Sequence, residues 1–143
     1  MKQVQKIAYV KALMYIAAAD ENVDETERQQ FTQLGDLYGL TDSEISQVAD
    51  SVIKKEESLE SILGNITDRS TQLLLMYDLM AICYVDNNYS LAEKNNMRTI
   101  TRIMGIEEAK LIEMESVMEE SVTLHKKINS ILEKQGDAQN ENW

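Results

Sequence analysis

The sequence predicts an all-α helical bundle of about seven helices, because three observations agree. The chain of 143 residues contains no proline and only five glycines, so few residues would interrupt a helix. Apolar residues recur with a period close to 3.6 through most of the chain. Aromatic residues make up only 6% of the chain, and runs that favour strands are scarce.

The first half of the chain is expected to hold three helices. The first covers residues 4–19, where apolar side chains follow the helical period. Asp24 is the predicted N-cap of the second helix, with Glu27 at capping-box spacing. That helix should end at Gly39, a C′ glycine, and Thr41 should cap the third helix.

A connector over residues 56–66 is expected to lead into the second half. The next helix, over residues 68–85, has few polar residues on any face, so we expect it to be the most buried one. Ser90, with Glu93 three residues later, should cap the following helix, which ends at Gly105. The predicted core consists of apolar residues at helical spacing: Met14, Ile16, Phe31, Leu34, Leu37, Leu75, Leu79, Ile82, Met97, Ile100 and Ile103.

The last predicted helix runs from about residue 107 to residue 135, and the polar residues 136–143 should form a flexible tail. A seam of residues with the spacing 3–4–3–4–3 runs along one side of this helix: Met114, Val117, Ser121, Leu124, Ile128 and Ile131. This seam could pack on its own bundle or pair with a second copy in a homodimer. It covers fewer than three heptads, which favours packing on its own bundle.

The two halves of the chain resemble each other at a constant offset of 66 residues, which pairs Leu13 with Leu79 and Gly39 with Gly105. Residues 13–45 align with residues 79–111 without a gap, and seven of the 33 positions are identical. A repeat of this kind predicts two pseudo-symmetric three-helix units that bury their apolar faces against each other. We therefore expect one domain over residues 1–135, divided as follows: repeat 1 about 4–55, connector 56–66, repeat 2 about 67–120, and a helical extension to 135.

Both halves carry the same acidic pattern at the turn between their first two helices. Alternate oxygen-bearing side chains in a tight turn can point toward one centre, an arrangement that suits Ca²⁺ or Mg²⁺. An EF-hand is a poor match, since Glu25 and Leu91 stand where its loop needs glycine. The candidate metal ligands are Asp20, Glu27, Asp86 and Glu93, with Asn22, Asp24 and Asn88 as additional ones.

A purely structural role for these residues is the alternative. Glu27 and Glu93 occupy the position at which a capping-box carboxylate accepts the N-cap backbone N–H. Asp20 and Asp86 can satisfy backbone amides within their turns. The sequence leaves both interpretations open.

The paired turns resemble those of the TerB-like family of tellurite-resistance proteins. The similarity covers roughly residues 5–120 and is carried by Ile16-Ala17-Ala18-Ala19-Asp20 with Glu27-Arg28, and by Asp86 with Glu93-Lys94. The resemblance implies an all-α domain whose acidic residues hold a divalent metal, in stress or tellurite-resistance systems that act with partner proteins near membranes. Glu21 and Asn87 stand where the family usually has glycine, and Asn87 tolerates a left-handed backbone better. The second turn should therefore bind a cation more strongly.

The charge, the cysteine content and the lack of a long apolar run favour some classes of function over others. The chain has 25 acidic and 14 basic residues and a net charge of −11, which disfavours nucleic acid and favours cations or basic partners. Its single cysteine, Cys83, fits a reducing compartment and a core position, so we expect a cytoplasmic protein. No apolar run is long enough to span a membrane, while peripheral association stays open.

No enzyme active site is predicted, because the sequence shows no nucleophile–base pair and no glycine-rich phosphate loop. The favoured function is a non-catalytic module that binds divalent metal. The alternative is a protein-interaction or homodimerisation module with an unidentified protein partner, and a metal-dependent hydrolase is less favoured.

Overall fold

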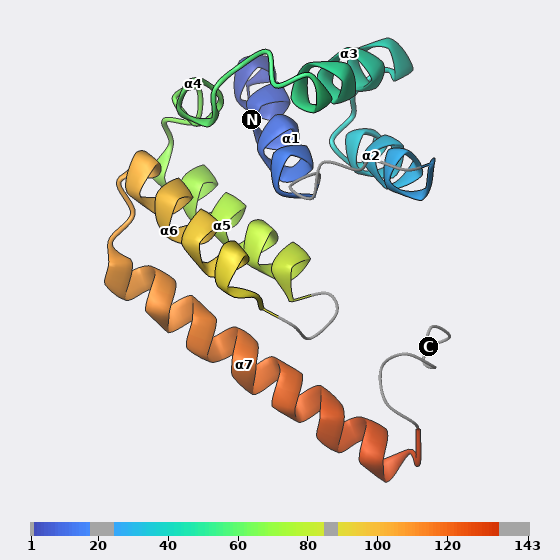
Figure 1. Ribbon diagram of the computed structural model, residues 1–143, viewed down its shortest axis with the longest axis vertical. Helices are drawn as coiled ribbons and strands as arrows, with labels where there is room; N and C mark the ends of the chain where they lie inside the picture. The colour runs from blue at the N-terminus through green and yellow to red at the C-terminus, as the bar shows by residue number, and fades with distance from the viewer. Residues whose placement is uncertain (1, 18–24, 85–88, 135–143) are drawn as a thin grey trace.

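The computed structural model describes residues 2–134 apart from residues 18–24 and 85–88. These residues form seven α-helices and no strand, which confirms the predicted all-α fold (Figure 1). None of the described helices combines the length and the apolar character that a membrane crossing requires. The helices in chain order are α1 (Gln3–Ala17), α2 (Glu25–Leu37), α3 (Asp42–Ile53), α4 (Leu59–Leu63), α5 (Arg69–Cys83), α6 (Leu91–Met104) and α7 (Glu108–Ile131).

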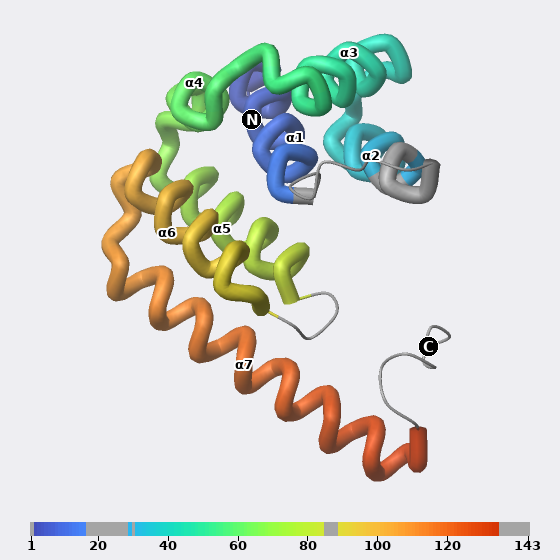
Figure 2. Tube along the Cα trace, viewed as in Figure 1, coloured from blue at the N-terminus to red at the C-terminus, as the bar shows by residue number. Residues whose placement is uncertain are grey.

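The helices form two groups that meet through α1 and α5 (Figure 2). In the first group, α1, α2 and α3 all pack against one another, and α1 also contacts α4. In the second group, α5, α6 and α7 likewise pack against one another. The short helix α4 lies in the connector and packs on both α1 and α6, so it helps to join the two groups.

Helix α1 is the most buried element, because it contributes to both apolar clusters. Tyr9 and Leu13 face the large cluster shared with α4, α5 and α6, while Val10 and Met14 face a smaller cluster with α2 and α3. The expectation that the helix over residues 68–85 is the most buried one is therefore wrong. In α5, Leu74 is 48% exposed, so one side of that helix faces solvent.

Most of the predicted core residues are buried, three are half-buried, and Leu37 is exposed. Leu34, Ile82 and Ile103 are half-buried, but Leu37 is 76% exposed, so its assignment to the core is wrong. The buried face of α2 passes through Phe31 and Gly35, which lies directly against the side chain of Ile45. Leu37 follows Gly35 by two residues, and a helix turns by about 200° over two residues.

The helix starts of the two groups are related by the same offset as the sequence repeat. Helices α1, α2 and α3 begin at residues 3, 25 and 42, and α5, α6 and α7 begin at residues 69, 91 and 108. Each later helix thus begins at the position that the repeat assigns to its counterpart. Gly39 and Gly105, which the repeat also pairs, both have positive φ, at 77° and 73°, which fits their predicted role at helix ends. A pseudo-symmetric superposition of the two groups in space stays a prediction.

The last helix is shorter than predicted. It ends at Ile131 with Leu132 as its C-cap, and Glu133 has a φ of 57°. A left-handed residue at this position ends the helix. Even so, α7 has 24 residues whereas its counterpart α3 has 12.

A partly buried polar contact joins the two groups. The hydroxyls of Tyr9 in α1 and Tyr38, just after α2, both donate to the Asp78 carboxylate in α5, the second over 3.2 Å. The two tyrosine rings lie 5.2 Å apart. Burial, together with the neighbouring carboxylate, raises the pKa of Tyr9. Because both hydroxyls remain protonated, they stabilise Asp78 at the junction of the two groups.

Candidate functional site

The second acidic turn lies in the link between α5 and α6, which pack against each other. Ser90 is the N-cap of α6, and its hydroxyl accepts the backbone N–H of Glu93 over 3.1 Å. In return, the Glu93 carboxylate accepts the backbone N–H of Ser90 over 2.8 Å. The predicted capping box is therefore present. Asp86 and Asn88 lie outside the described residues.

The first acidic turn lies in the corresponding link between α1 and α2. Glu27 is the third residue of α2, the position expected for a capping-box glutamate. The other candidate ligands of this turn, Asp20, Asn22 and the predicted N-cap Asp24, lie outside the described residues. Only Glu93 is therefore a candidate ligand whose side-chain contacts the structure describes.

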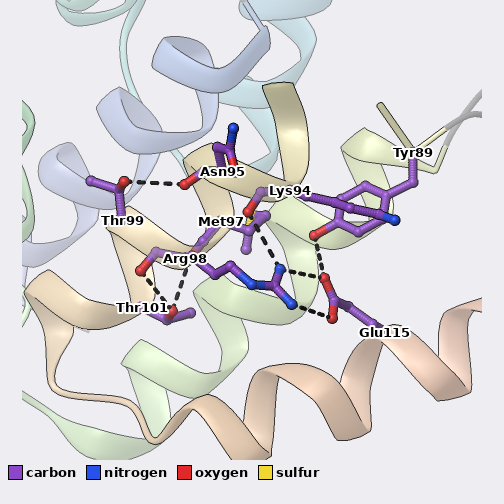
Figure 3. A network of polar contacts seen from close by, with 8 residues as sticks. All are labelled: Tyr89, Lys94, Asn95, Met97, Arg98, Thr99, Thr101 and Glu115. Atoms are coloured by element: carbon purple, nitrogen blue, oxygen red, sulfur yellow. Dashed lines mark hydrogen bonds and ion pairs between the residues drawn. The ribbon is translucent and has the colours of Figure 1, made fainter. Parts of the chain in front are cut away.

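A polar network adjoins the second turn and ties it to α7 (Figure 3). Tyr89, next to the N-cap, donates its hydroxyl to Glu115 of α7 over 2.8 Å. Arg98 of α6 donates two hydrogen bonds to the same carboxylate, over 2.9 and 3.1 Å. Lys94 lies over the Tyr89 ring, 5.7 Å from its centre, so a cation already occupies one face of this aromatic ring.

The network keeps Glu115 charged. Burial alone would raise the pKa of this carboxyl, but the hydrogen bonds from Arg98 and Tyr89 outweigh it and lower the pKa. The pKa of Tyr89 is raised, first by burial and then by its hydrogen bond to Glu115. Glu115 is thus an ionised acceptor at pH 7, held by three donated hydrogen bonds.

A small pocket lies between the link and α7. It has a volume of about 270 Å³ and is lined by Tyr84, Tyr89, Lys94, Glu119, Val122 and Thr123. The rings of Tyr84 and Tyr89 stack with their centres 4.7 Å apart. The Tyr84 hydroxyl is buried and has no hydrogen-bond partner. Burial, together with the charges of Glu119 and Glu115, raises the pKa of Tyr84 to about 12.

Sequence reasoning missed this network, although the repeat contains a signal for it. At the offset of the repeat, Tyr89, Arg98 and Glu115 correspond to Val23, Thr32 and Ala49. The second unit thus carries aromatic and charged side chains where the first has small or apolar ones. Positions at which the two copies differ in this way would have indicated a feature specific to the second unit.

The described residues contain no group of three or more His, Cys, Asp or Glu placed to hold a metal ion. Five of the seven candidate ligands lie outside this part of the chain, so it does not include either complete turn. Cys83 is buried in α5, as expected for a core residue. His125 lies in the C-terminal half of α7, away from the second turn in sequence.

The seven helices of the described residues define an all-α helical module. The family described as tellurite resistance protein TerB matches residues 6–116, which is most of the chain. The chain therefore belongs to the TerB family, in agreement with the resemblance of its acidic turns. No curated protein and no solved structure matches the chain significantly.

Proposed function

We propose that the chain is a non-catalytic TerB-family module that binds a divalent cation, Ca²⁺ or Mg²⁺, at two acidic helix turns. One site would use Asp20 and Glu27, and the other Asp86 and Glu93. Because the chain belongs to the TerB family, we propose that the module acts in a cytoplasmic stress response or a tellurite-resistance response. The observation that carries the proposal is the recurrence of one acidic spacing in two links, α1 to α2 and α5 to α6, which the repeat makes equivalent.

The chemistry of the turns supports a hard cation. Oxygen ligands from carboxylates and amides suit Ca²⁺ and Mg²⁺, and each turn offers them at alternate positions. Two neighbouring carboxylates repel each other, and a cation between them removes that repulsion. The net charge of −11 favours the approach of cations in general.

The capping role of Glu93 is compatible with binding. One carboxylate oxygen, Oε1, accepts the Ser90 N–H. An ionised carboxylate has two oxygens and about four lone-pair positions, so a capping carboxylate can also ligate a cation. The proposal contains no catalytic step, because the single cysteine is buried and the single histidine lies in α7.

The structure supplies a matched control for this proposal. Glu44 forms a capping box with Thr41 at the start of α3, with bonds of 2.9 and 3.2 Å, and that helix does not follow an acidic turn. Glu44→Gln and Glu93→Gln therefore perturb the same kind of cap. If Glu93 is also a ligand, only Glu93→Gln should weaken the response to a cation.

The experiment combines calorimetric titration with thermal melting in Ca²⁺, Mg²⁺, Mn²⁺ and Zn²⁺. At a cation concentration of about 100 times Kd, each site should add about 2.7 kcal/mol to the free energy of unfolding. Asp86→Asn and Glu93→Gln should reduce that gain more than Asp20→Asn does, whereas Glu44→Gln should preserve it. If millimolar cation shifts the melting of the wild type no more than that of the Asp20→Asn/Asp86→Asn double variant, the turns are helix caps. The module would then be assigned to protein interaction.

A further inference from the structure

Helix α7 presents an apolar surface that the other described helices do not cover. Val117 is 54% exposed, Leu124 59% and Ile131 80%. We call the residues Met114, Val117, Ser121, Leu124, Ile128 and Ile131 the α7 seam. Only Met114 in this set packs against the large core cluster. The expectation that the seam packs on its own bundle is therefore wrong.

A different face of α7 holds the helix on the bundle. Leu111 is fully buried, and Met118 and Val122 pack against the same cluster. At about 100° per residue, Val117 and Leu124 lie roughly 120° around the helix from this core-facing stripe. The C-terminal half of α7 extends past the other described helices (Figures 1 and 2). The seam is thus accessible while α7 remains docked.

The charges along α7 are divided between its two halves. Residues 108–120 contain five glutamates and one lysine, whereas residues 121–131 contain two lysines, one histidine and no acidic residue. Two copies of α7 in parallel would align acidic half with acidic half. An antiparallel arrangement places each acidic half beside a basic half, which is the favourable pairing.

From the seam and this charge pattern, we propose that the protein self-associates through α7 as an antiparallel pair. The occupant of the seam is a second copy of this chain, related by a two-fold axis. This inference is independent of the cation sites, because none of the seam residues belongs to either acidic turn.

The spacing fixes the register of the pair. In an antiparallel coiled coil, a positions face d positions, so Ser121 faces Leu124 of the partner subunit and Val117 faces Ile128 of the partner subunit. The same register places Glu120 beside Lys127 of the partner subunit, and symmetry produces this ion pair twice. Glu120 and Lys127 are both exposed in the single chain.

The geometry also keeps the two bundles apart. Each bundle covers the N-terminal half of its own α7, and antiparallel pairing directs these halves to opposite ends. The seam is shorter than the three to four heptads of an isolated coiled coil. Here, however, α7 is already folded on its bundle, so association need not order it. We therefore expect a reversible dimer of moderate affinity.

The first test is sedimentation equilibrium of the full chain between about 5 and 500 µM, a range that spans micromolar dissociation constants. The wild type should show a concentration-dependent monomer–dimer equilibrium. Leu124→Asp should abolish it, whereas Ile112→Asp should preserve it. Ile112 is a matched control, since it is 52% exposed on the same helix but outside the seam. A wild type that is monomeric throughout, or a dimer that Leu124→Asp leaves intact, would overturn the proposal.

The second test reverses the proposed ion pair. Glu120→Lys and Lys127→Glu should each raise the dissociation constant about tenfold, because each change replaces two attractive contacts by two repulsive ones. The combined variant Glu120→Lys/Lys127→Glu should return to within about threefold of the wild type. If the combined variant is as weak as the single variants, the antiparallel register is wrong.

A spin label at Ser130, which is exposed and lies outside the seam, reports the orientation directly. The antiparallel register separates the two labels by about 22 Å along the helix axis, whereas a parallel pair would place them at the same position along that axis. A distance distribution that corresponds to labels at the same axial position would overturn the antiparallel arrangement.

Discussion

Truncation of Glu115 to alanine should destabilise the fold by about 2–2.5 kcal/mol. This carboxylate accepts a hydrogen bond from Tyr89 and two from Arg98, and its side chain is 14% exposed. Loss of the Tyr89 bond to a charged acceptor should cost about 1.5 kcal/mol. The Arg98 side chain is 32% exposed and can regain water, so its share should be only about 0.5–1 kcal/mol.

Urea unfolding of the wild type, Glu115→Ala, Arg98→Ala and the double variant gives the coupling between the two side chains. The acid dependence provides a second readout. Because folding lowers the pKa of Glu115, its contribution should be complete above the unfolded value of about 4.3. It should be lost as the pH falls through the folded value. A penalty below about 0.5 kcal/mol at pH 7, or one that is unchanged at pH 3, would refute this reasoning.

Four further substitutions test the packing of the core. Leu79 is fully buried and Leu37 is 76% exposed, so Leu79→Ala should cost about 2–5 kcal/mol while Leu37→Ala stays within about 0.5 kcal/mol, both measured by urea unfolding. A Cβ added at Gly35 would lie 2.3 Å from Cγ1 of Ile45, so Gly35→Ala should cost about 1–3 kcal/mol. Ile45→Val removes Cδ1 but retains Cγ1, so it should relieve only part of that penalty; full recovery would contradict the contact.

Local signals in the sequence were sufficient to predict most helix boundaries. Thr41 and Ser90 are the expected N-caps, Ser90 forms the expected capping box with Glu93, and Gly39 and Gly105 adopt the left-handed backbone expected at helix ends. These features depend on residues within one turn of each other, so spacing alone reveals them. Burial depends on tertiary packing instead. Leu37 follows Leu34 at helical spacing, which predicts a core position, but α2 turns the face with Phe31 and Gly35 to the core instead.

The candidate site was predictable only in part, for a similar reason. Glu93 lies in the first turn of α6, three residues after Ser90, and this spacing alone predicts its capping contact. The contact between Arg98 and Glu115 spans 17 residues and depends on the packing of α6 against α7. No periodicity within one helix encodes such a pair, so it became visible only once the helices were placed.

The differences between the two units show where this chain departs from its repeat. The matched apolar pairs Leu13/Leu79, Phe31/Met97 and Leu40/Ile106 are buried in both units, as the predicted repeat requires. Within the described residues, the Tyr89–Arg98–Glu115 network, the pocket beside it and the exposed half of α7 belong to the second unit. In an internal repeat, packing keeps the common positions alike, while a surface used only once can diverge. The network fixes α7 on its bundle at Glu115, two residues before the seam begins to be exposed at Val117. A binding surface needs a rigid support, and the second unit provides it at the point where α7 leaves the core.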